Sequence, residues 1–228
     1  YDIAVTGTTQ DLLVGIPQAD AVLSGLGTID AKAVRDTEGT RLERLRIQTD
    51  AAVVTGSADL TSGGSDAEFD ITVADVAMIE PRLSGPIAIK GTALQNAEGL
   101  TVLDLTGQAK DTDFIFNADV NATPTGQTVN FKTTAEVADL SNYSRIAGRG
   151  LDGSANVNAS GVILGDGMRF IADVTAETRN LVTGIGQLDP LLRGDGTLQT
   201  KLRRTGQDAF RLENLILTSD TVAISGSG

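Results

Sequence analysis

The sequence predicts an all-β protein with short helical inserts, built as a repetitive and elongated β-sheet. Apolar and polar residues alternate with a period of two over many segments, and the run from Phe114 to Ala122 is the longest of these. Only 4% of the residues are aromatic, Trp is absent, and 26 glycines separate the apolar runs. This composition is typical of many short strands joined by turns. Each strand is expected to have one face turned away from water and one wet face.

A short helix-like run that ends in Leu/Ile-x-Gly recurs along the chain. The glycines of these stops are Gly25, Gly85, Gly148 and Gly194, separated by 60, 63 and 46 residues. Self-similarity at such a period indicates a repeat architecture. We expect each repeat to hold one helix-like insert followed by about four to six strands. The expected repeats are 1–66, 67–137, 138–177 and 178–228.

Four inserts are expected, and the first of them has the clearest helical signal. Its apolar residues stand at positions 12, 13, 16, 19, 22 and 23, which fits one stripe of a helix. Pro17 lies inside this stripe, so we expect a short or interrupted helix that Gly25 terminates. The expected inserts are Gln10–Leu23, Ala74–Leu83, Ala138–Ile146 and Thr178–Leu192.

Charge and residue types exclude several classes of function. The net charge of −12 repels phosphate backbones, so no nucleic acid partner is expected. The chain has no Cys and no His, which excludes disulfides, thiol nucleophiles, His-based triads and the usual zinc sites. A chain free of Cys is compatible with an oxidising compartment such as the periplasm. We expect no cofactor and no metal ion.

The chain begins at Tyr1 without Met and shows no signal-peptide pattern. No apolar run approaches the ~18 to 20 residues that a membrane-spanning helix needs. We therefore expect residues 1–228 to be an internal fragment of a longer repeat protein.

The motifs that could indicate a cofactor or metal site occur in the wrong structural context. Gly148–Gly153 matches the dinucleotide pattern G-x-G-x-x-G, but a helix-like run precedes it and a strand follows, the reverse of what that site requires. Two isolated Gly-Asp-Gly triplets, at 165–167 and 194–196, lack the tandem repeats of calcium-binding turns, and a type I′ hairpin explains the first. The many acidic residues fall on the polar phase of strands. We therefore expect no enzymatic activity.

The repeated Leu-x-Gly-strand unit resembles the periplasmic repeats of the TamB and AsmA-like family. The resemblance covers most of the chain, and the segments that carry it are Arg44–Leu60, Leu83–Ile89 and Gly194–Leu198. The alanine-rich, Cys-free composition is similar to that of alphaproteobacterial members.

This resemblance implies a long sheet curled into an open groove, often called a β-taco, with an apolar concave face. It also implies that the chain is part of a periplasm-spanning groove, which conducts phospholipids between the inner and outer membranes and supports outer-membrane protein assembly. The full-length parent would be anchored in the inner membrane of a Gram-negative bacterium and would engage an Omp85-type outer-membrane partner. Both of those contacts would lie outside residues 1–228.

Periodicity alone leaves two interpretations of the apolar face open. Acyl chains of phospholipid could cover it, since burial contributes ~0.8 kcal/mol per CH₂. Alternatively, the face could pack on itself in a structural or adhesive β-solenoid with a closed, dry core, as in autotransporter passenger domains. The residues expected to line the face are the in-phase apolar residues of the strands: Ile3, Val5, Leu45, Ile47, Phe69, Ile71, Val73, Leu103, Leu105, Phe114, Phe116, Val120, Val129, Phe131, Val157, Met168, Phe170, Val174, Leu198, Leu202, Leu215 and Leu217.

Overall fold

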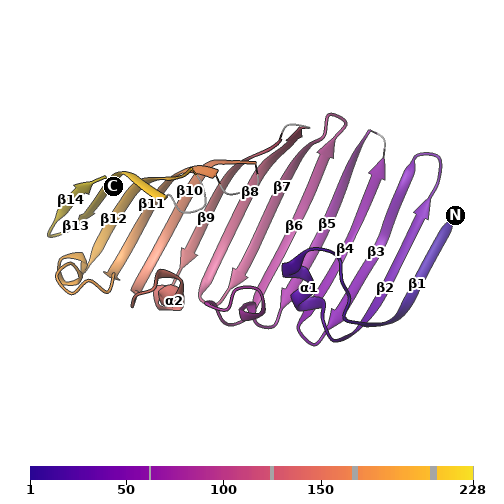
Figure 1. The fold of residues 1–228 in the computed structure, drawn as a ribbon, viewed down its shortest axis with the longest axis horizontal. Coiled ribbons are helices and arrows are strands. Elements are labelled where there is room, and N and C mark those ends of the chain that lie inside the picture. Colours follow the sequence, from indigo (N-terminus) through magenta and orange to yellow (C-terminus); the bar gives the residue numbers. More distant parts are fainter. Residues whose placement is uncertain (62, 124–125, 166–168, 206–209, 228) are drawn as a thin grey trace. The chain divides into compact units, whose positions relative to one another are not determined.

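The computed structural model describes residues 1–61, 63–123, 126–165, 169–205 and 210–227. These residues form fourteen antiparallel strands of one sheet, and the order of the strands in the sheet follows their order in the sequence (Figure 1). The first and last strands do not pair, so the sheet is open. The prediction of an all-β fold with short helical inserts is confirmed. The chain divides into two compact units, Tyr1–Lys110 and Asp111–Gly228, which are described separately below.

The first unit holds seven strands, one α-helix and one 3₁₀-helix. The elements are β1 (Asp2–Gln10), α1 (Pro17–Leu23), β2 (Leu26–Arg35), β3 (Gly39–Thr49), β4 (Ala52–Thr61), β5 (Gly64–Val73), η1 (Val76–Met78), β6 (Ile87–Asn96) and β7 (Leu100–Ala109).

The second unit also holds seven strands, again with short inserts between them. The elements are β8 (Thr112–Thr123), β9 (Gly126–Val137), η2 (Leu140–Tyr143), α2 (Ser144–Ala147), β10 (Asp152–Leu164), β11 (Arg169–Val182), η3 (Asp189–Leu192), β12 (Asp195–Arg204), β13 (Phe210–Ser219) and β14 (Ala223–Gly226).

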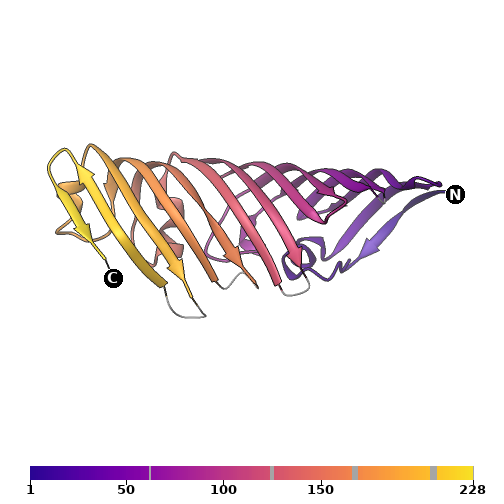
Figure 2. The ribbon, with the colours of Figure 1, turned by 90° about the horizontal axis from the view of Figure 1, so that it is seen from above.

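All helical inserts of a unit lie along the same edge of its strands. Each insert connects an odd-numbered strand to the next even-numbered one, and in an antiparallel meander such connections all fall at the same strand ends (Figure 1). We call this edge the insert rim. The opposite edge, where β2 turns into β3 and β4 into β5, is called the hairpin rim. Each strand of a unit pairs with its neighbours in sequence within the one sheet, which Figure 2 shows from a second side.

Helix α1 begins at Pro17 because proline suits the first position of a helix, where its missing N–H is not needed. Only the second half of the expected apolar stripe therefore lies in the helix. Leu13 and Ile16 precede the helix in an exposed loop. Val22 and Leu23 at the end of α1 are buried in a cluster with strand residues of the same unit. The helix thus covers the end of the sheet nearest the insert rim.

Two of the predicted glycine stops share one hydrogen-bonded closure. The N–H of Asp11 donates to the carbonyl oxygen of Gly25 (2.9 Å), and the Asp11 Oδ1 accepts from the N–H of Gly25 (2.9 Å). Asn180 and Gly194 repeat both bonds, at 2.8 and 3.2 Å. Both glycines have a positive φ, 86° and 85°, which favours glycine. The closure joins the end of one strand to the start of the next across the insert.

The other two stops only partly share this arrangement. The N–H of Gly85 donates to the Asp75 Oδ1 (3.0 Å), and the Gly85 carbonyl accepts from the N–H of Val76 (2.8 Å). Gly148 instead caps α2 in the left-handed conformation, four residues before β10 begins at Asp152. All four stops leave an insert and none lies inside a strand, but Gly148 is not equivalent to the rest.

The strands are less evenly distributed over the inserts than the sequence suggests. Along the described chain, the first and second inserts are each followed by four strands, the third by two and the fourth by three. The fourth insert is shorter than expected because residues 178–182 continue β11, where Thr178 is buried and pairs with Ala155. The expected repeat limits at 66/67 and 177/178 fall inside β5 and β11. The expected type I′ turn at 165–167 includes residues outside the described ones.

Replacing Gly25 with Ala tests whether the stop depends on its backbone conformation. No atom would crowd a Cβ at Gly25 or at Gly7, but only Gly25 has a positive φ. We expect Gly25→Ala to lower the free energy of unfolding by about 1 to 2 kcal/mol, measured by urea denaturation. The matched Gly7→Ala should leave it unchanged or slightly raised. Equal effects from the two variants would contradict this role of Gly25.

Candidate functional site

The strand register aligns rows of apolar residues on one face of the sheet in each unit. Residues directly opposite each other on paired strands point to the same side, and residues two apart along a strand do so as well. In the first unit one row of paired residues crosses five strands from β2 to β6. The row is Ile29, Ile47, Val54, Ile71 and Ile89.

In the second unit a similar row crosses all seven strands from β8 to β14. Its members pair in succession: Phe114, Ala135, Val157, Ala176, Leu198, Leu217 and Ile224. We call the side that carries these rows the apolar face of each unit, and the opposite side the charged face.

The register places every described member of the predicted lining set on the apolar face of its own unit. Met168 lies outside the described residues. The first unit's members are Ile3, Val5, Leu45, Ile47, Phe69, Ile71, Val73, Leu103 and Leu105. The second unit's members are Phe114, Phe116, Val120, Val129, Phe131, Val157, Phe170, Val174, Leu198, Leu202, Leu215 and Leu217. What these residues contact in the cell stays a prediction.

The apolar face is only half-covered by the protein itself. Ile47 and Val73, next to α1, are buried, but Ile3 and Val5 are 48% and 49% exposed. The five Phe residues with described side chains are all half-buried. The strands therefore leave apolar surface open that a second layer would cover in a sandwich.

Large and small side chains alternate across this face. Phe69 pairs with Gly56 on one side and with Gly91 on the other. A Cβ at Gly91 would lie 3.0 Å from the Phe69 Cζ and would also contact Leu105. The ring therefore lies over glycine, an arrangement that shields the bare backbone of a strand. Phe116 and Phe131 stack in the second unit, with ring centroids 6.1 Å apart.

Sequence reasoning missed several residues of the same face. Ile29, Val54, Ile89 and Ile224 complete the rows described above. The alternation of Ile87, Ala88, Ile89 and Lys90 could have added Ile89 to the predicted lining, since it is a period-2 pattern. Which rows line up across strands could not be found this way, because the register depends on the turns that join the strands.

The insert rim closes one end of the apolar face in each unit. In the first unit the Thr49 hydroxyl donates to the carbonyl oxygen of Val22 (2.9 Å) and so ties α1 to β3. In the second unit Leu192 of η3 is 2% exposed, and the hydroxyls of Ser219 and Thr221 donate to the carbonyl oxygen of Leu191. Helical residues therefore cover the face where the inserts lie.

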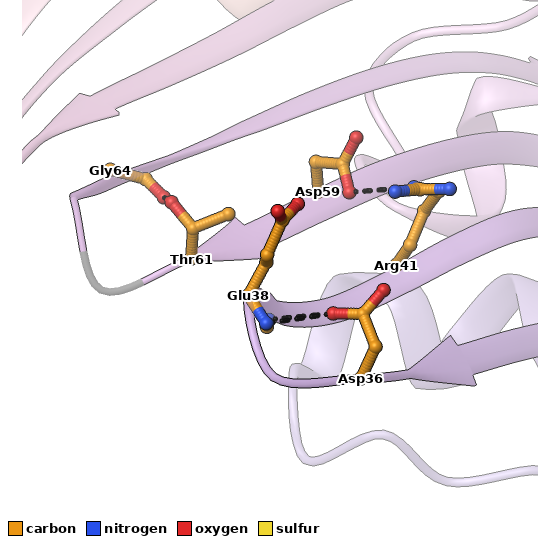
Figure 3. Close-up of polar contacts among 7 residues, drawn as sticks. Asp36, Glu38, Arg41, Asp59, Thr61 and Gly64 are labelled. Atoms are coloured by element: carbon orange, nitrogen blue, oxygen red, sulfur yellow. Dashed lines mark hydrogen bonds and ion pairs between the residues drawn. The ribbon is translucent and has the colours of Figure 1, made fainter. Parts of the chain in front are cut away.

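The hairpin rim has no such cover in the described residues. Polar contacts close its turns locally: the Asp36 Oδ1 accepts from the N–H groups of Glu38 (2.8 Å) and Gly39 (3.2 Å), and the Thr61 hydroxyl donates to the carbonyl oxygen of Gly64 (2.7 Å; Figure 3). Leu60, on the apolar face at this rim, is 51% exposed. In the described residues of the first unit, the apolar face thus meets water at the hairpin rim.

Ion pairs between neighbouring strands cover the charged face. Arg41 and Asp59 pair across β3 and β4 at 3.1 Å, beside the hairpin rim (Figure 3). Such exposed pairs contribute little to stability, but they keep this face wet. Further cross-strand pairs among the described residues include Lys32–Asp2, Lys32–Glu43, Arg44–Asp30, Lys90–Asp70, Arg179–Asp195, Lys201–Asp173 and Arg203–Glu213.

The carboxyl groups with shifted pKa values lie on the charged face or in loops. A hydrogen bond from Lys32 lowers the pKa of Glu43, and the backbone N–H groups of Glu38 and Gly39 lower that of Asp36. In the insert after β5, the Arg82 side chain lowers the pKa of Glu80 to about 2. Each shift has a local partner on the surface and needs no buried or reactive site.

Other kinds of site find little support in the described residues. They hold no group of three or more acidic side chains that could bind a metal ion. A cavity of about 390 Å³ near the hairpin rim is lined by Asp59, Asp66, Leu94 and Val102, among others. The register puts these four on the charged face, so the cavity is not part of the apolar face. No described helix has the length and hydropathy needed to cross a membrane.

Comparison of the chain with protein family models, curated proteins and solved structures returned no match. The resemblance to the TamB and AsmA-like family therefore stays a prediction, and the apolar face is the candidate site on physical grounds.

The low pKa of Glu80 predicts a specific pH dependence. The Arg82 Nε donates to the Glu80 Oε1 at 2.8 Å. A carboxyl group whose pKa is depressed in the folded state stabilises that state at pH values above its ordinary pKa, which is 4.5 for Glu80. This contribution is lost as the pH falls towards about 2. In ¹³C NMR titrations the Glu80 carboxyl should titrate near pH 2, and Arg82→Gln should move its midpoint towards 4.5. A midpoint that Arg82→Gln leaves unchanged would contradict this pairing.

Proposed function

We propose that the chain is a segment of a hydrophobic groove that holds the acyl chains of phospholipids on its apolar face. The observation that carries this proposal is the half-exposed apolar face of each unit, which crosses every strand and over which the described residues of that unit place no second layer. The segment performs no chemistry of its own and acts as a surface along which lipid moves.

Acyl chains suit this face for a physical reason. Each methylene that leaves water for an apolar surface contributes ~0.8 kcal/mol, so two chains supply a substantial affinity without any specific pocket. The face is lined mainly by Val, Ile, Leu, Ala and Phe, and threonines on it, such as Thr133 and Thr200, donate their hydroxyls to carbonyl oxygens of neighbouring strands. Such a lining holds lipid without fixing it in one position.

The route of the lipid rests on the family resemblance alone. On that basis the proposed groove spans the periplasm of a Gram-negative bacterium, conducts phospholipids between the inner and outer membranes and supports outer-membrane protein assembly. An inner-membrane anchor and an Omp85-type partner would belong to the parent protein outside residues 1–228.

The alternative of a closed, dry core requires a second layer opposite the apolar face. Within each unit, the described residues that lie over this face belong to the insert rim and cover only its end. No observation on the described residues favours the structural or adhesive β-solenoid over the open face.

Photo-crosslinking from adjacent strand positions tests the proposal. Phe116 and Val157 lie on the apolar face, whereas their neighbours Asn117 and Asn156 lie on the charged face. We expect a photoreactive residue at 116 or 157 to capture phospholipid in cells, detected by mass spectrometry, and one at 117 or 156 to capture little. Equal capture from both faces would count against a lipid groove.

A carboxylate on the apolar face should separate lipid binding from folding. Phe116 is half-buried, so water can reach an Asp at this position and folding should survive. We expect Phe116→Asp to lower the thermal midpoint by about 2 to 4 °C per kcal/mol of lost packing and to abolish phospholipid binding by the purified chain. The matched Asn117→Asp adds the same charge on the other face and should preserve both properties. A fall of tens of degrees for Phe116→Asp would instead support a closed core.

A further inference from the structure

One backbone amide of the second unit lies against the side chain of the residue before it. The N–H of Gly153 donates to the Oδ1 of Asp152 at 2.6 Å, where the third insert leads into β10. A backbone nitrogen that follows aspartate can close a five-membered ring with the carboxyl carbon of that side chain. Glycine leaves this approach unhindered, because it has no Cβ. The contact therefore holds the two reacting groups of such a ring closure together.

The contact forms where the strand register is interrupted. Asp152 of β10 lies opposite Val182 of β11. The next residue of β10 that pairs with β11 is Ser154, so the register passes over Gly153. Gly153 has a φ of 95°, a conformation that favours glycine and departs from that of a regular strand. An N–H that the ladder does not use needs another acceptor, and the Asp152 carboxylate supplies it.

A second Asp-Gly pair in the same unit lacks this freedom. Gly196 pairs with Thr178 of β11 on one side and with Ser219 of β13 on the other. A residue that is paired on both sides of an antiparallel ladder directs its N–H to one of its two neighbours. The Asp195 carboxylate is also engaged, since its Oδ1 accepts from the Arg179 Nε at 3.0 Å. The register thus separates two pairs that have the same two residues.

We propose that Asp152–Gly153 is a site of spontaneous backbone modification, at which Asp152 converts to isoaspartate through a cyclic succinimide. The Gly153 nitrogen attacks the Asp152 Cγ and forms an N–Cγ bond, while one carboxyl oxygen leaves as water with the carboxyl proton and the amide proton. Water then opens the ring. Hydrolysis of the new N–Cγ bond restores aspartate, whereas hydrolysis of the original peptide bond leaves the chain running through the side chain as isoaspartate. No reagent other than water takes part.

The product would alter the connection between the third insert and β10. Isoaspartate lengthens the backbone by one carbon atom next to Leu151, whose N–H donates to the Ser144 Oγ at 2.9 Å and so ties the start of β10 to α2. Asp152 is exposed, so the longer backbone can move into water. We therefore expect the modified chain to stay folded with a weaker connection to α2. This modification does not depend on the lipid-binding function proposed above.

The two Asp-Gly pairs allow an internal comparison, since Asp-Gly-Ser at 152–154 and Asp-Gly-Thr at 195–197 have nearly the same local sequence. The purified chain is incubated in mildly acidic buffer and digested, and electron-transfer dissociation mass spectrometry then locates isoaspartate residue by residue. In the folded chain we expect isoaspartate to form at position 152 about tenfold faster than at 195, because the ladder must open locally before the Gly196 nitrogen can react. In urea the two rates should converge, since unfolding removes the register. The Asp-Gly pair at 166–167 lies outside the described residues and does not enter the comparison.

Two variants complete the test. Asp152→Glu keeps a carboxylate before Gly153 but requires a less favoured six-membered ring, so it should abolish the modification there and leave position 195 unchanged. Gly153 itself is kept, because a Cβ at this position would lie 2.5 Å from the carbonyl oxygen of Arg179. Arg179→Gln removes the ion pair of Asp195 and leaves the ladder in place, so position 195 should stay slow. Equal rates at 152 and 195 in the folded chain, or a difference that persists in urea, would overturn the proposal. Absence of isoaspartate at 152, or an Arg179→Gln variant in which 195 reacts as fast as 152, would overturn it as well.

Discussion

The structure depends on one constraint: a sheet with an apolar face must have something to cover that face. In the two units the strands supply the face but not the cover, because the described inserts are too short to extend beyond one rim. Burial of apolar area is the main stabilising term in folding, so a half-covered face gives up part of that stabilisation. A ligand that covers the face would restore it by binding to the folded chain and not to the unfolded one.

The rest of the fold limits the consequences of that exposure. Ion pairs across neighbouring strands keep the opposite face charged, which disfavours stacking of one sheet on another. Glycines beneath Phe69 allow the ring to lie close to the strands instead of projecting into water. The inserts bury Val22, Leu23 and Leu192 at one rim. The exposed part of the face is thereby limited to the strands and the hairpin rim.

The sequence predicts which side of the sheet a residue faces better than it predicts where each strand ends. Period-2 alternation correctly sorted residues such as Phe114 and Val157, because side-chain direction in a strand is set locally. It failed at the fourth insert, where Thr178 belongs to β11. Thr178 is part of this strand because it pairs with β10 and β12, and the residues around Thr178 in the sequence do not indicate that pairing. It also treated Gly148 as equivalent to Gly25. The difference lies in hydrogen bonds to Asp11 and to Ser144 that no local pattern specifies.

Arg204 shows most clearly what a one-dimensional reading leaves out. In the sequence it is one of two adjacent arginines at the end of a strand, and nothing distinguishes it from Arg203. The register with β11 separates them, because Arg203 pairs with Ile171 on the charged face while Arg204 pairs with Phe170 on the apolar one. A charge among apolar side chains is costly unless water or a counter-charge satisfies it, and a position at the end of a strand gives either one the easiest access. The face of a residue near a strand end therefore depends on which residue of the neighbouring strand it pairs with, and that pairing is set by the turns and not by the residue's own neighbours in sequence.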